Sequence, residues 1–393
     1  MAAEPVPEWV KSPFALQPRD LRIAERCGLR SGDNLNVPRL IAASAILGWL
    51  VLLLLCLAAG TAYGDRVTVA FLRDFFAYGR YLVAAPLLLL MSMLVERRTA
   101  RALAYLHDSG LVTAAEESIR SIVLTASRVW QSRLFRWTLL ALTGVSVGLG
   151  WSYMRVAETS SWMFTGEHGA GHLSWAGIWN LLVGGAIVKF LGLTALAKML
   201  IWLWVLWRLS KLPLRINPLH PDRCCGLRLL GQTQLAFAPL ISALSVQLGC
   251  AIAVGVRYHG MSLAGFRWIA ALFIVLSVVV LLGPLAVFAR RSLHAIEEAE
   301  QSFGAWANLA GRFTAEERVA PRGDPADQLS QPEISAFTDA SATFANLLES
   351  KIVPIDRRLL FAALAAAAVP MVLPLLVLLP LRSIMADLVK ILI

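Results

Sequence analysis

Residues 40–63, LIAASAILGWLVLLLLCLAAGTAY, contain no charged side chain, and most positions are apolar. Because a transmembrane helix needs about 20 consecutive apolar residues, this stretch is long enough to cross a bilayer. Six further apolar runs follow along the chain, at Phe75–Leu94, Leu134–Met154, Trp175–Leu209, Leu235–Val256, Trp268–Ala289 and Leu359–Leu381. The pattern predicts an all-α polytopic integral membrane protein, a helical bundle of about seven transmembrane helices. The count falls to six if the last run, which contains Pro370, Pro374 and Pro380, only dips into the bilayer.

Composition supports the same class of protein. The 393 residues are 58% hydrophobic and only 16% charged, whereas soluble domains have about 25% charged residues. The formal net charge of +10 is typical of Arg and Lys that flank membrane spans on the cytoplasmic side. Since no basic module with interleaved aromatic residues is visible, we expect no nucleic-acid partner. The five cysteines form no disulfide framework, and we expect neither a cofactor nor a metal.

The distribution of Arg and Lys predicts the orientation in the membrane. The connections after the second, fourth and sixth runs are rich in Arg, whereas the connection after the third has only Arg155 at its edge. The positive-inside rule therefore places the N-terminus and residues 212–231 in the cytoplasm. The predicted segments are a cytoplasmic N-terminal tail (1–39), spans one and two (40–98), an amphipathic cytoplasmic helical segment (99–133), spans three and four (134–211), a cytoplasmic loop (212–231), spans five and six (232–289), cytoplasmic helices with a linker (290–358), and a proline-rich last span with its tail (359–393).

The loop 212–231, LPLRINPLHPDRCCGLRLLG, gathers polar side chains between two apolar runs. Its arginines and a following helix start favour a site for a phosphate or a lipid head group. A metal site in this loop is less favoured, because its possible ligands are crowded within six positions. A proton-transfer role for His220 with Asp222 is also less favoured, because no nucleophile can be named beside the pair. The candidate ligand-binding residues of the loop are Arg215, His220, Asp222, Arg223 and Arg228.

The leading interpretation of this loop is structural: a capped turn whose Asp222 and Arg223 charges hold it against neighbouring helices. We predict that Asp222 orients the loop by accepting backbone N–H bonds or by pairing with a nearby Arg, as turn aspartates do. Arg223 should point its planar guanidinium toward a buried acceptor or a phosphate. The adjacent Cys224 and Cys225 are predicted to stay reduced in the cytoplasm.

Polar side chains at membrane depth are a second set of candidates. Lys189 lies near the middle of the fourth run, where a charge costs about 2.5–3.5 kcal/mol on the insertion scale, so it should face the bundle, a water cavity or a partner. The alternative is a structural lysine that carbonyl groups or Gln247 satisfy, or one that snorkels. Arg80, about one turn inside the second run, can reach the outer interface or pair with Asp74. No Asp or Glu lies in a predicted span core, so an anionic or neutral solute fits better than a metal cation.

The run 207–227, WRLSKLPLRINPLHPDRCCGL, resembles the central signature of a family of uncharacterised bacterial multi-pass inner-membrane proteins. That signature is a Leu-rich, Arg-containing lead followed by His-Pro-Asp-Arg, a small residue, Gly-Gly and Leu. The chain departs from it by having Cys224 and Cys225 at positions of small residues. A looser similarity covers residues 71–89, FLRDFFAYGRYLVAAPLLL, and the proline-rich final span. The resemblance implies a bacterial inner-membrane location and no particular activity. The matching residues of the signature are His220, Pro221, Asp222, Arg223, Gly226 and Leu227.

Two functions of different class follow from these observations. The leading hypothesis is a bundle in the lipid bilayer that handles a small anionic or neutral solute or a lipid head group. The alternative is a non-transporting scaffold or sensor, whose segments 99–133 and 290–358 contact a cytoplasmic protein or a second copy of the chain. An enzyme comes third, because no nucleophile or substrate pocket can be named, and we assign no catalytic residue.

Overall fold

The computed structural model describes residues 12–15, 22, 25–26, 28–31, 34–111, 116–156, 161–165, 172–319, 342 and 344–376. Regular structure within these residues is almost entirely helical, which confirms the all-α prediction. Two short antiparallel hairpins are the exceptions. In the first, β1 (Arg30–Ser31) pairs with β2 (Asn34–Leu35), and in the second, β3 (Phe164–Thr165) pairs with β4 (His172–Leu173).

Seven helices in the described part of the chain are long and apolar enough to cross a membrane. This finding fits the expected multi-pass membrane protein, and the proline-containing last run is one of the seven helices long enough to cross. In chain order the spans are α2 (Val37–Ala45), η2 (Ile46–Leu50) and α3 (Val51–Ala58); α4 (Phe75–Tyr78), η4 (Gly79–Ala84) and α5 (Ala85–Asp108); α7 (Arg133–Val156); α8 (Trp175–Trp179), η5 (Asn180–Gly184) and α9 (Gly185–Leu209); α10 (Arg228–Gln234), η6 (Leu235–Phe237) and α11 (Ala238–Tyr258); η7 (Leu263–Phe266), α12 (Arg267–Leu282), η8 (Gly283–Phe288) and α13 (Ala289–Val319); and α15 (Arg357–Leu376).

Two boundaries differ from those expected. The fifth helix begins at Arg228, so the last residues of the 212–231 segment are helical, because Leu230 packs into the hydrophobic core. The second helix continues without a break to Asp108, since Leu103 and Leu106 extend its buried face. A separate amphipathic helix, α6 (Glu116–Gln131), then forms the rest of the 99–133 segment.

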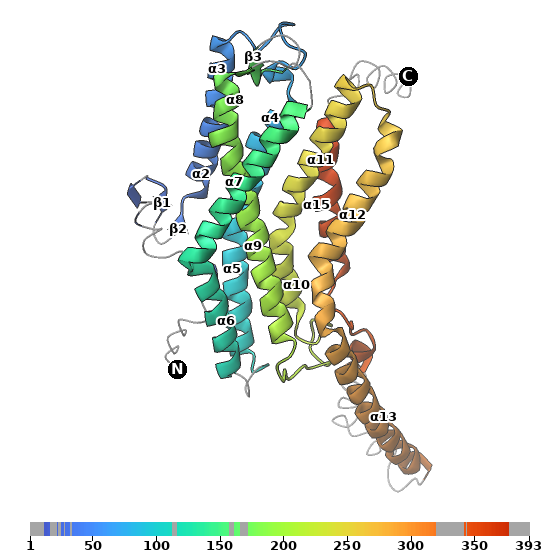
Figure 1. Cartoon of the computed structure of the whole chain (residues 1–393). Helices are drawn as coiled ribbons and strands as arrows, with labels where there is room; N and C mark the ends of the chain where they lie inside the picture. The colour runs from blue at the N-terminus through green and yellow to red at the C-terminus, as the bar shows by residue number, and fades with distance from the viewer. Residues whose placement is uncertain are drawn as a thin grey trace, which may run out of the picture.

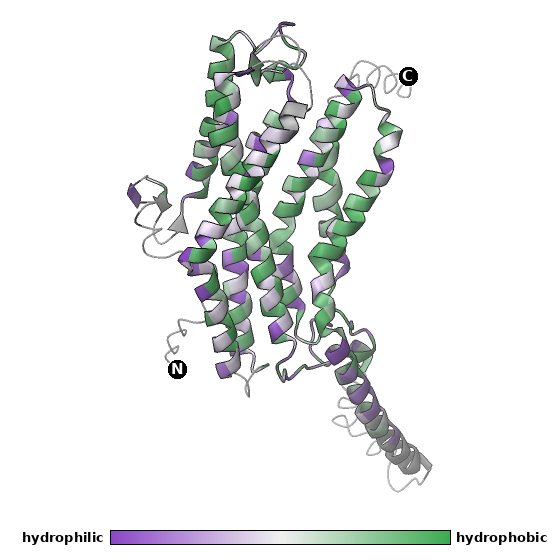
Figure 2. Ribbon diagram, in the orientation of Figure 1, coloured by the Kyte–Doolittle hydropathy of each residue, from purple (hydrophilic) through white to green (hydrophobic). Residues whose placement is uncertain are grey.

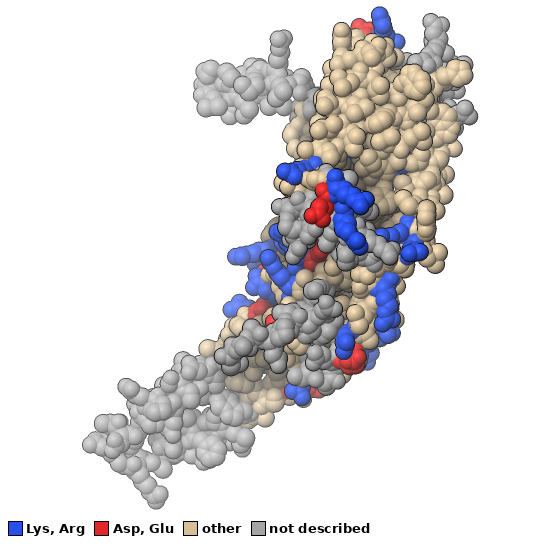
Figure 3. Space-filling view, turned by 90° about the vertical axis from the view of Figure 1, so that its left-hand side faces the viewer, with Lys and Arg blue, Asp and Glu red and all other residues tan. Residues whose placement is uncertain are grey.

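The bundle has an uncharged band, and most of its charged side chains gather toward one end. We call the end at which residues 212–227 lie the loop end; it is the lower end in Figure 1. Hydrophobic residues cover the upper parts of the helices, and hydrophilic residues gather toward the loop end and along α13 (Figure 2). On the face drawn in Figure 3, charged side chains lie over the lower half and at the upper tip, with an uncharged band between them. Several spans have more than 30 residues, beyond the roughly 20 that a bilayer needs, and their surplus turns lie at the loop end.

The fifth and seventh spans pack against each other at a position where no side chain intervenes. Gly249 of α11 lies against the backbone of Met371 in α15, and a Cβ at Gly249 would overlap the Met371 carbonyl oxygen. Pro370 has no N–H group, so it leaves the carbonyl of Ala366 without its partner inside the helix. The hydroxyl of Ser242 on α11 donates to that carbonyl at 3.1 Å. The neighbouring span thus completes the hydrogen bonds that the proline removes, as membrane helices require.

Three π-helical turns, η2, η4 and η5, meet in the upper half of the bundle. Buried Tyr81 lies at their centre, with its ring against Gly48 and its hydroxyl group against Gly184. The Tyr81 hydroxyl donates to the side-chain oxygen of Asn180, and the amide nitrogen of Asn180 lies 3.4 Å from the sulfur of Met163. Glycine at the two contact positions leaves the space that the tyrosine ring fills.

The sixth span continues directly into α13, which leaves the bundle at the loop end and extends away from it (Figure 1). Near the bundle, Ile296 of α13 packs with Cys225 and Leu347 in a small hydrophobic cluster. The ring of Phe303 stacks on Phe344, with 5.0 Å between ring centroids. The helix is therefore attached both to the loop of residues 212–227 and to the segment that precedes the last span.

Candidate functional site

The central loop, residues 210–227, connects α9 to α10 and is organised by Asp222. Prolines in this stretch remove backbone donors and prevent a continuous helix. One carboxylate oxygen of Asp222 accepts the N–H of Cys224 at 2.8 Å and that of Gly226 at 3.0 Å. The other accepts the N–H of Arg228, the first residue of α10, at 3.2 Å. Asp222 thus forms the capped turn that its position after Pro221 predicts, and it satisfies a helix N-terminus.

The turn requires a left-handed backbone at three positions. Arg223 has a φ of 54°, Cys225 a φ of 58° and Gly226 a φ of 82°. Only glycine adopts this region without penalty, and a non-glycine residue there costs about 1–3 kcal/mol where the surroundings hold it. The hydrogen bonds to Asp222 offset that cost. The backbone reversal turns the Arg223 side chain outward, while both cysteines are buried.

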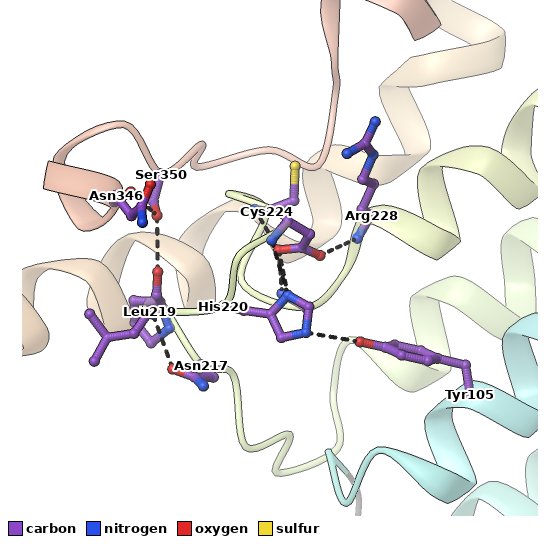
Figure 4. Close-up of polar contacts among 11 residues, drawn as sticks. Tyr105, Asn217, Leu219, His220, Cys224, Arg228, Asn346 and Ser350 are labelled. Atoms are coloured by element: carbon purple, nitrogen blue, oxygen red, sulfur yellow. Dashed lines mark hydrogen bonds and ion pairs between the residues drawn. The ribbon is translucent and has the colours of Figure 1, made fainter. Parts of the chain in front are cut away.

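His220 joins the central loop to the second span. Its Nδ1 atom lies 3.0 Å from a carboxylate oxygen of Asp222, and its Nε2 atom lies 3.4 Å from the hydroxyl oxygen of Tyr105 in α5. Figure 4 shows the imidazole between the turn and this tyrosine. The histidine is therefore a bridge between two elements, with an imidazole that is only part-buried.

Residues 344–356 cover the outer side of the central loop and lead into α15; we call them the strap. Residues 344–348 are helical. The hydroxyl of Ser350 donates to the carbonyl of Pro218 at 3.0 Å (Figure 4). The backbone N–H of Lys351 donates to the carbonyl of Arg223 at 2.9 Å, and Leu347 is fully buried. Backbone, hydroxyl and apolar contacts together hold the strap on the loop.

A pocket of about 360 Å³ lies between the central loop and the strap. Its charges come from three cationic side chains and three carboxylates, two groups of equal size. All but one of the lining residues are charged. The lining residues are Asp222, Arg223, Cys224, Arg228, Glu349, Lys351 and Asp356.

The cationic side chains of the pocket retain hydrogen-bonding capacity. Arg228 contacts Asp356 at 3.2 Å, and Lys351 contacts the other oxygen of that carboxylate at 3.5 Å. Arg223 pairs with Glu349 through one guanidinium nitrogen and donates to Asn346 through another at 3.3 Å. Since Arg has five N–H donors and Lys three, these side chains use only a minority of their donors on protein groups among the described residues. An oxygen-rich anion matches the donors that are left.

Hydrogen bonding determines the charge state of Asp222. Burial by itself would raise the pKa of this carboxyl group. The three backbone N–H bonds, together with the nearby imidazole, outweigh burial and hold the pKa below its ordinary value. The pKa of Asp356 is also lowered, since the ammonium of Lys351 and the guanidinium of Arg228 outweigh its slight desolvation. Both groups are therefore carboxylates at neutral pH.

The two cysteines of the loop are not activated thiols. Burial raises the pKa of Cys225 to about 11, and the negative charge of Asp222 adds to the effect. Burial likewise raises the pKa of Cys224. A thiol in this state is a poor nucleophile at neutral pH. Among the described residues, no group of three or more His, Cys, Asp and Glu side chains is arranged to hold a metal ion.

The other candidates from the sequence lie apart from the pocket. The side chain of Arg215 is exposed, and its backbone N–H donates to the carbonyl of Leu111 at 2.9 Å. Lys189 donates from its ammonium group to the carbonyl of Ser146 in α7 at 2.8 Å. A carbonyl thus satisfies Lys189, which is the structural alternative that the sequence left open, and Gln247 is not its partner.

Asp74 and Arg80, both in the described part of the chain, do not form an ion pair within 4 Å. Asp74 caps α4 by accepting the N–H of Phe76 at 2.9 Å, and it accepts the indole N–H of Trp162 at 3.0 Å. Asp74 is 7% exposed, so these bonds replace the water around its carboxylate.

A buried lysine in α9 was missed by the sequence reasoning. Lys198 is 5% exposed, and its ammonium lies 5.2 Å from the ring centroid of Trp130 and 5.9 Å from that of Phe14. Phe14 comes from residues 12–15 of the predicted tail, where the hydroxyl of Ser12 hydrogen-bonds that of Thr99 at 2.8 Å. Part of the 1–39 segment is therefore packed into the bundle. A second lysine in the fourth apolar run was the available signal.

The strap residues of the pocket were also missed. Glu349, Lys351 and Asp356 lie in a polar stretch that the sequence shows only as a short helix and a connection. The signal that could have identified them is the run 351–356, KIVPID, in which two opposite charges flank a proline directly before a span. Tyr105, the partner of His220, is one of several polar residues on a helix and carried no signal.

No family model, no curated protein and no solved structure matches this chain. The fold and the site define its class: a seven-span helical membrane protein with a charged pocket at one end of the bundle.

Proposed function

We propose that the protein is an inner-membrane protein with its N-terminus in the cytoplasm, which binds a small anionic solute or an anionic lipid head group in the pocket between the central loop and the strap. Membership of the bacterial family that the loop resembles is part of the proposal, with Asp222 as the capping residue and Arg223 as a pocket cation. The chemistry shared by the two kinds of ligand is a phosphate or carboxylate group.

The charge distribution supports the cytoplasmic placement of the pocket. The loop end carries Arg97, Arg98 and Arg101 on the surplus turns of α5. It also carries Arg208 in the last turn of α9 and Lys211 just after that helix. Basic residues of this kind flank the cytoplasmic ends of membrane spans. A pocket in this place is open to solutes of the cytoplasm and lies near the head groups of the inner leaflet.

The observation that carries the proposal is the unused donor capacity of the pocket cations. Arg228 and Lys351 share one carboxylate, Asp356, so most of their N–H groups have no protein acceptor among the described residues. Guanidinium groups bind phosphate and carboxylate in a planar, two-pronged geometry. An anion in the pocket would meet Arg228 and Lys351 without displacing either from Asp356.

Binding to the full-length protein in lipid nanodiscs tests the proposal. We expect inorganic phosphate, titrated by calorimetry, to bind in neutral phosphatidylcholine discs. Arg228→Gln should weaken this binding at least about tenfold, since one charge-assisted hydrogen bond contributes about 1.5–3 kcal/mol. Arg215→Gln is the matched control, because Arg215 is a loop arginine outside the pocket. The second arm measures retention of phosphatidylglycerol by native mass spectrometry. If phosphate does not bind, and if Arg228→Gln loses the lipid while Arg215→Gln retains it, the head group is the ligand. Equal behaviour of both variants toward both ligands would rule the proposal out.

Lys189 tests whether the solute also crosses the bundle. We expect Lys189→Met to leave phosphate binding unchanged and the thermal midpoint equal or higher, because the change removes a charge that is costly to bury. The bond from Lys189 to Ser146 supports this structural role. Loss of solute uptake into vesicles, with binding retained, would instead put Lys189 on the path of the solute.

A non-transporting scaffold or sensor is the second candidate. The observation in its favour is α13, which extends beyond the bundle (Figure 1) while its inner turns contact both the central loop and the strap. A photo-crosslinking residue at Glu298, which is exposed on α13, would capture a cytoplasmic partner or a second copy in cells. No crosslinked product from this position would argue against this candidate.

A further inference from the structure

We propose that Glu349 is a built-in competitor for the anionic ligand, so that a phosphate or carboxylate group bound at Arg223 displaces Glu349 and loosens the strap from the central loop. This inference rests on the proposed function, because it needs an anion in the pocket. It adds a consequence of binding, which is a change in how α13 and α15 are held at the loop end.

The ion pairs of the pocket differ in how easily an incoming anion can replace them. Arg223 and Glu349 are 51% and 58% exposed, and such exposed pairs contribute only about 0.2–1 kcal/mol. Asp356 is 23% exposed and is held by two cations, Arg228 and Lys351. The Glu349 end of the strap is thus the weak end, and the Asp356 end, directly before α15, is the fixed end.

Arg223 holds the strap by its backbone as well as by its side chain. Its carbonyl accepts the N–H of Lys351, and its guanidinium contacts Asn346 and Glu349. Its backbone is in the left-handed region, with a φ of 54°, so the direction of its Cα–Cβ bond is fixed while the turn is intact. An anion bound at the guanidinium edge that now faces Glu349 and Asn346 would therefore replace two of the three contacts of this residue with the strap.

Loosening of the strap can affect α13, because the strap contacts that helix directly. Leu347 of the strap packs with Ile296 of α13, and Phe344 stacks on Phe303 of the same helix. Both strap residues lie within a helical turn or so of Glu349. Ligand binding would thus change the contacts of α13 through the strap. The two proposed functions, solute binding and sensing, would then act through the same site.

The first measurement compares phosphate affinity in the wild type and in Glu349→Gln, using the full-length protein in phosphatidylcholine nanodiscs. Removing the competitor should tighten phosphate binding two- to fivefold, which corresponds to about 0.4–1 kcal/mol at 1.4 kcal/mol per tenfold change. Glu298→Gln is the matched control, because Glu298 is exposed on α13 outside the pocket, and its affinity should equal that of the wild type.

The second measurement follows alkylation of the buried thiols by N-ethylmaleimide, located at Cys224 and Cys225 by peptide mass spectrometry. Phosphate should speed alkylation in the wild type, and Glu349→Gln should be faster than the wild type without phosphate. Phosphate binding with unchanged affinity and alkylation in Glu349→Gln would overturn this inference and leave the proposed function standing. An absence of phosphate and lipid binding in both proteins would overturn both proposals.

Discussion

Replacing Asp222 by Ala should open the central loop locally while the membrane spans stay folded. The substitution removes the acceptor of three backbone N–H groups, at 2.8, 3.0 and 3.2 Å. An unsatisfied buried donor costs about 1–3 kcal/mol, and water reaches part of this turn, so we take the total as about 3 kcal/mol. At 1.4 kcal/mol per tenfold change, the population of the open loop rises about a hundredfold.

The assay is the alkylation rate of Cys224 and Cys225 in the purified full-length protein, because both thiols are buried under the turn. In the local-opening regime this rate follows the open population. Asp222→Asn keeps one oxygen for two of the N–H groups and loses the charge. Its alkylation rate should therefore lie between those of the wild type and Asp222→Ala, at about tenfold above the wild type. Glu298→Ala controls for a lost carboxylate elsewhere. An Asp222→Ala rate within twofold of the wild type would refute the organising role of this residue.

Three further predictions concern stability. The first concerns Asp222, whose carboxyl pKa is lowered in the folded protein. The stability that this carboxylate contributes is therefore present above its pKa in the unfolded chain, about 3.9, and is lost as the pH falls through the folded pKa. Hydrogen exchange of the loop amides, corrected for intrinsic rate, should rise in that acid range and stay flat from pH 5 to 8. Gly249→Ala should lower the thermal midpoint, because overpacking against the Met371 backbone costs about 1–3 kcal/mol, whereas Gly144→Ala, which meets open space, should not. Ser242→Ala should destabilise by about 1–2 kcal/mol, and by much less when Pro370→Ala restores the N–H group; equal effects in both backgrounds would contradict the hydrogen-bond explanation.

The spans were predictable because their signal is local. A charge-free run such as 40–63 must form a helix in a bilayer, because its backbone N–H and C=O groups can hydrogen-bond only to one another there. The role of Asp222 was predictable for a related reason, because an aspartate after a proline and shortly before a glycine bonds to its own turn. Each of these conclusions needs only residues that are close in the sequence.

The pocket was not predictable because its two sides are distant in the chain. Arg223 and its partner Asn346 are separated by 123 positions, and no periodic pattern in the strap indicates which charges it presents to the loop. The environment of Lys198 was hidden in the same way, since Trp130 and Phe14 come from two other segments. The π-helical turns around Tyr81 depend on packing against neighbouring spans, which local propensity does not contain.

The hydrogen bond from Ser242 to the carbonyl freed by Pro370 constrains how the protein is made. A lone α15 in lipid would expose that carbonyl to hydrocarbon, where an unsatisfied polar group costs several kcal/mol. The seventh span is therefore more stable when α11 is already present to receive it. The chain order already ensures this sequence of events, because the ribosome delivers the fifth span before the seventh. The last helix thus joins a bundle that already contains its hydrogen-bond donor, and a chain without the fifth span should retain its C-terminal helix in the membrane less well than the intact chain.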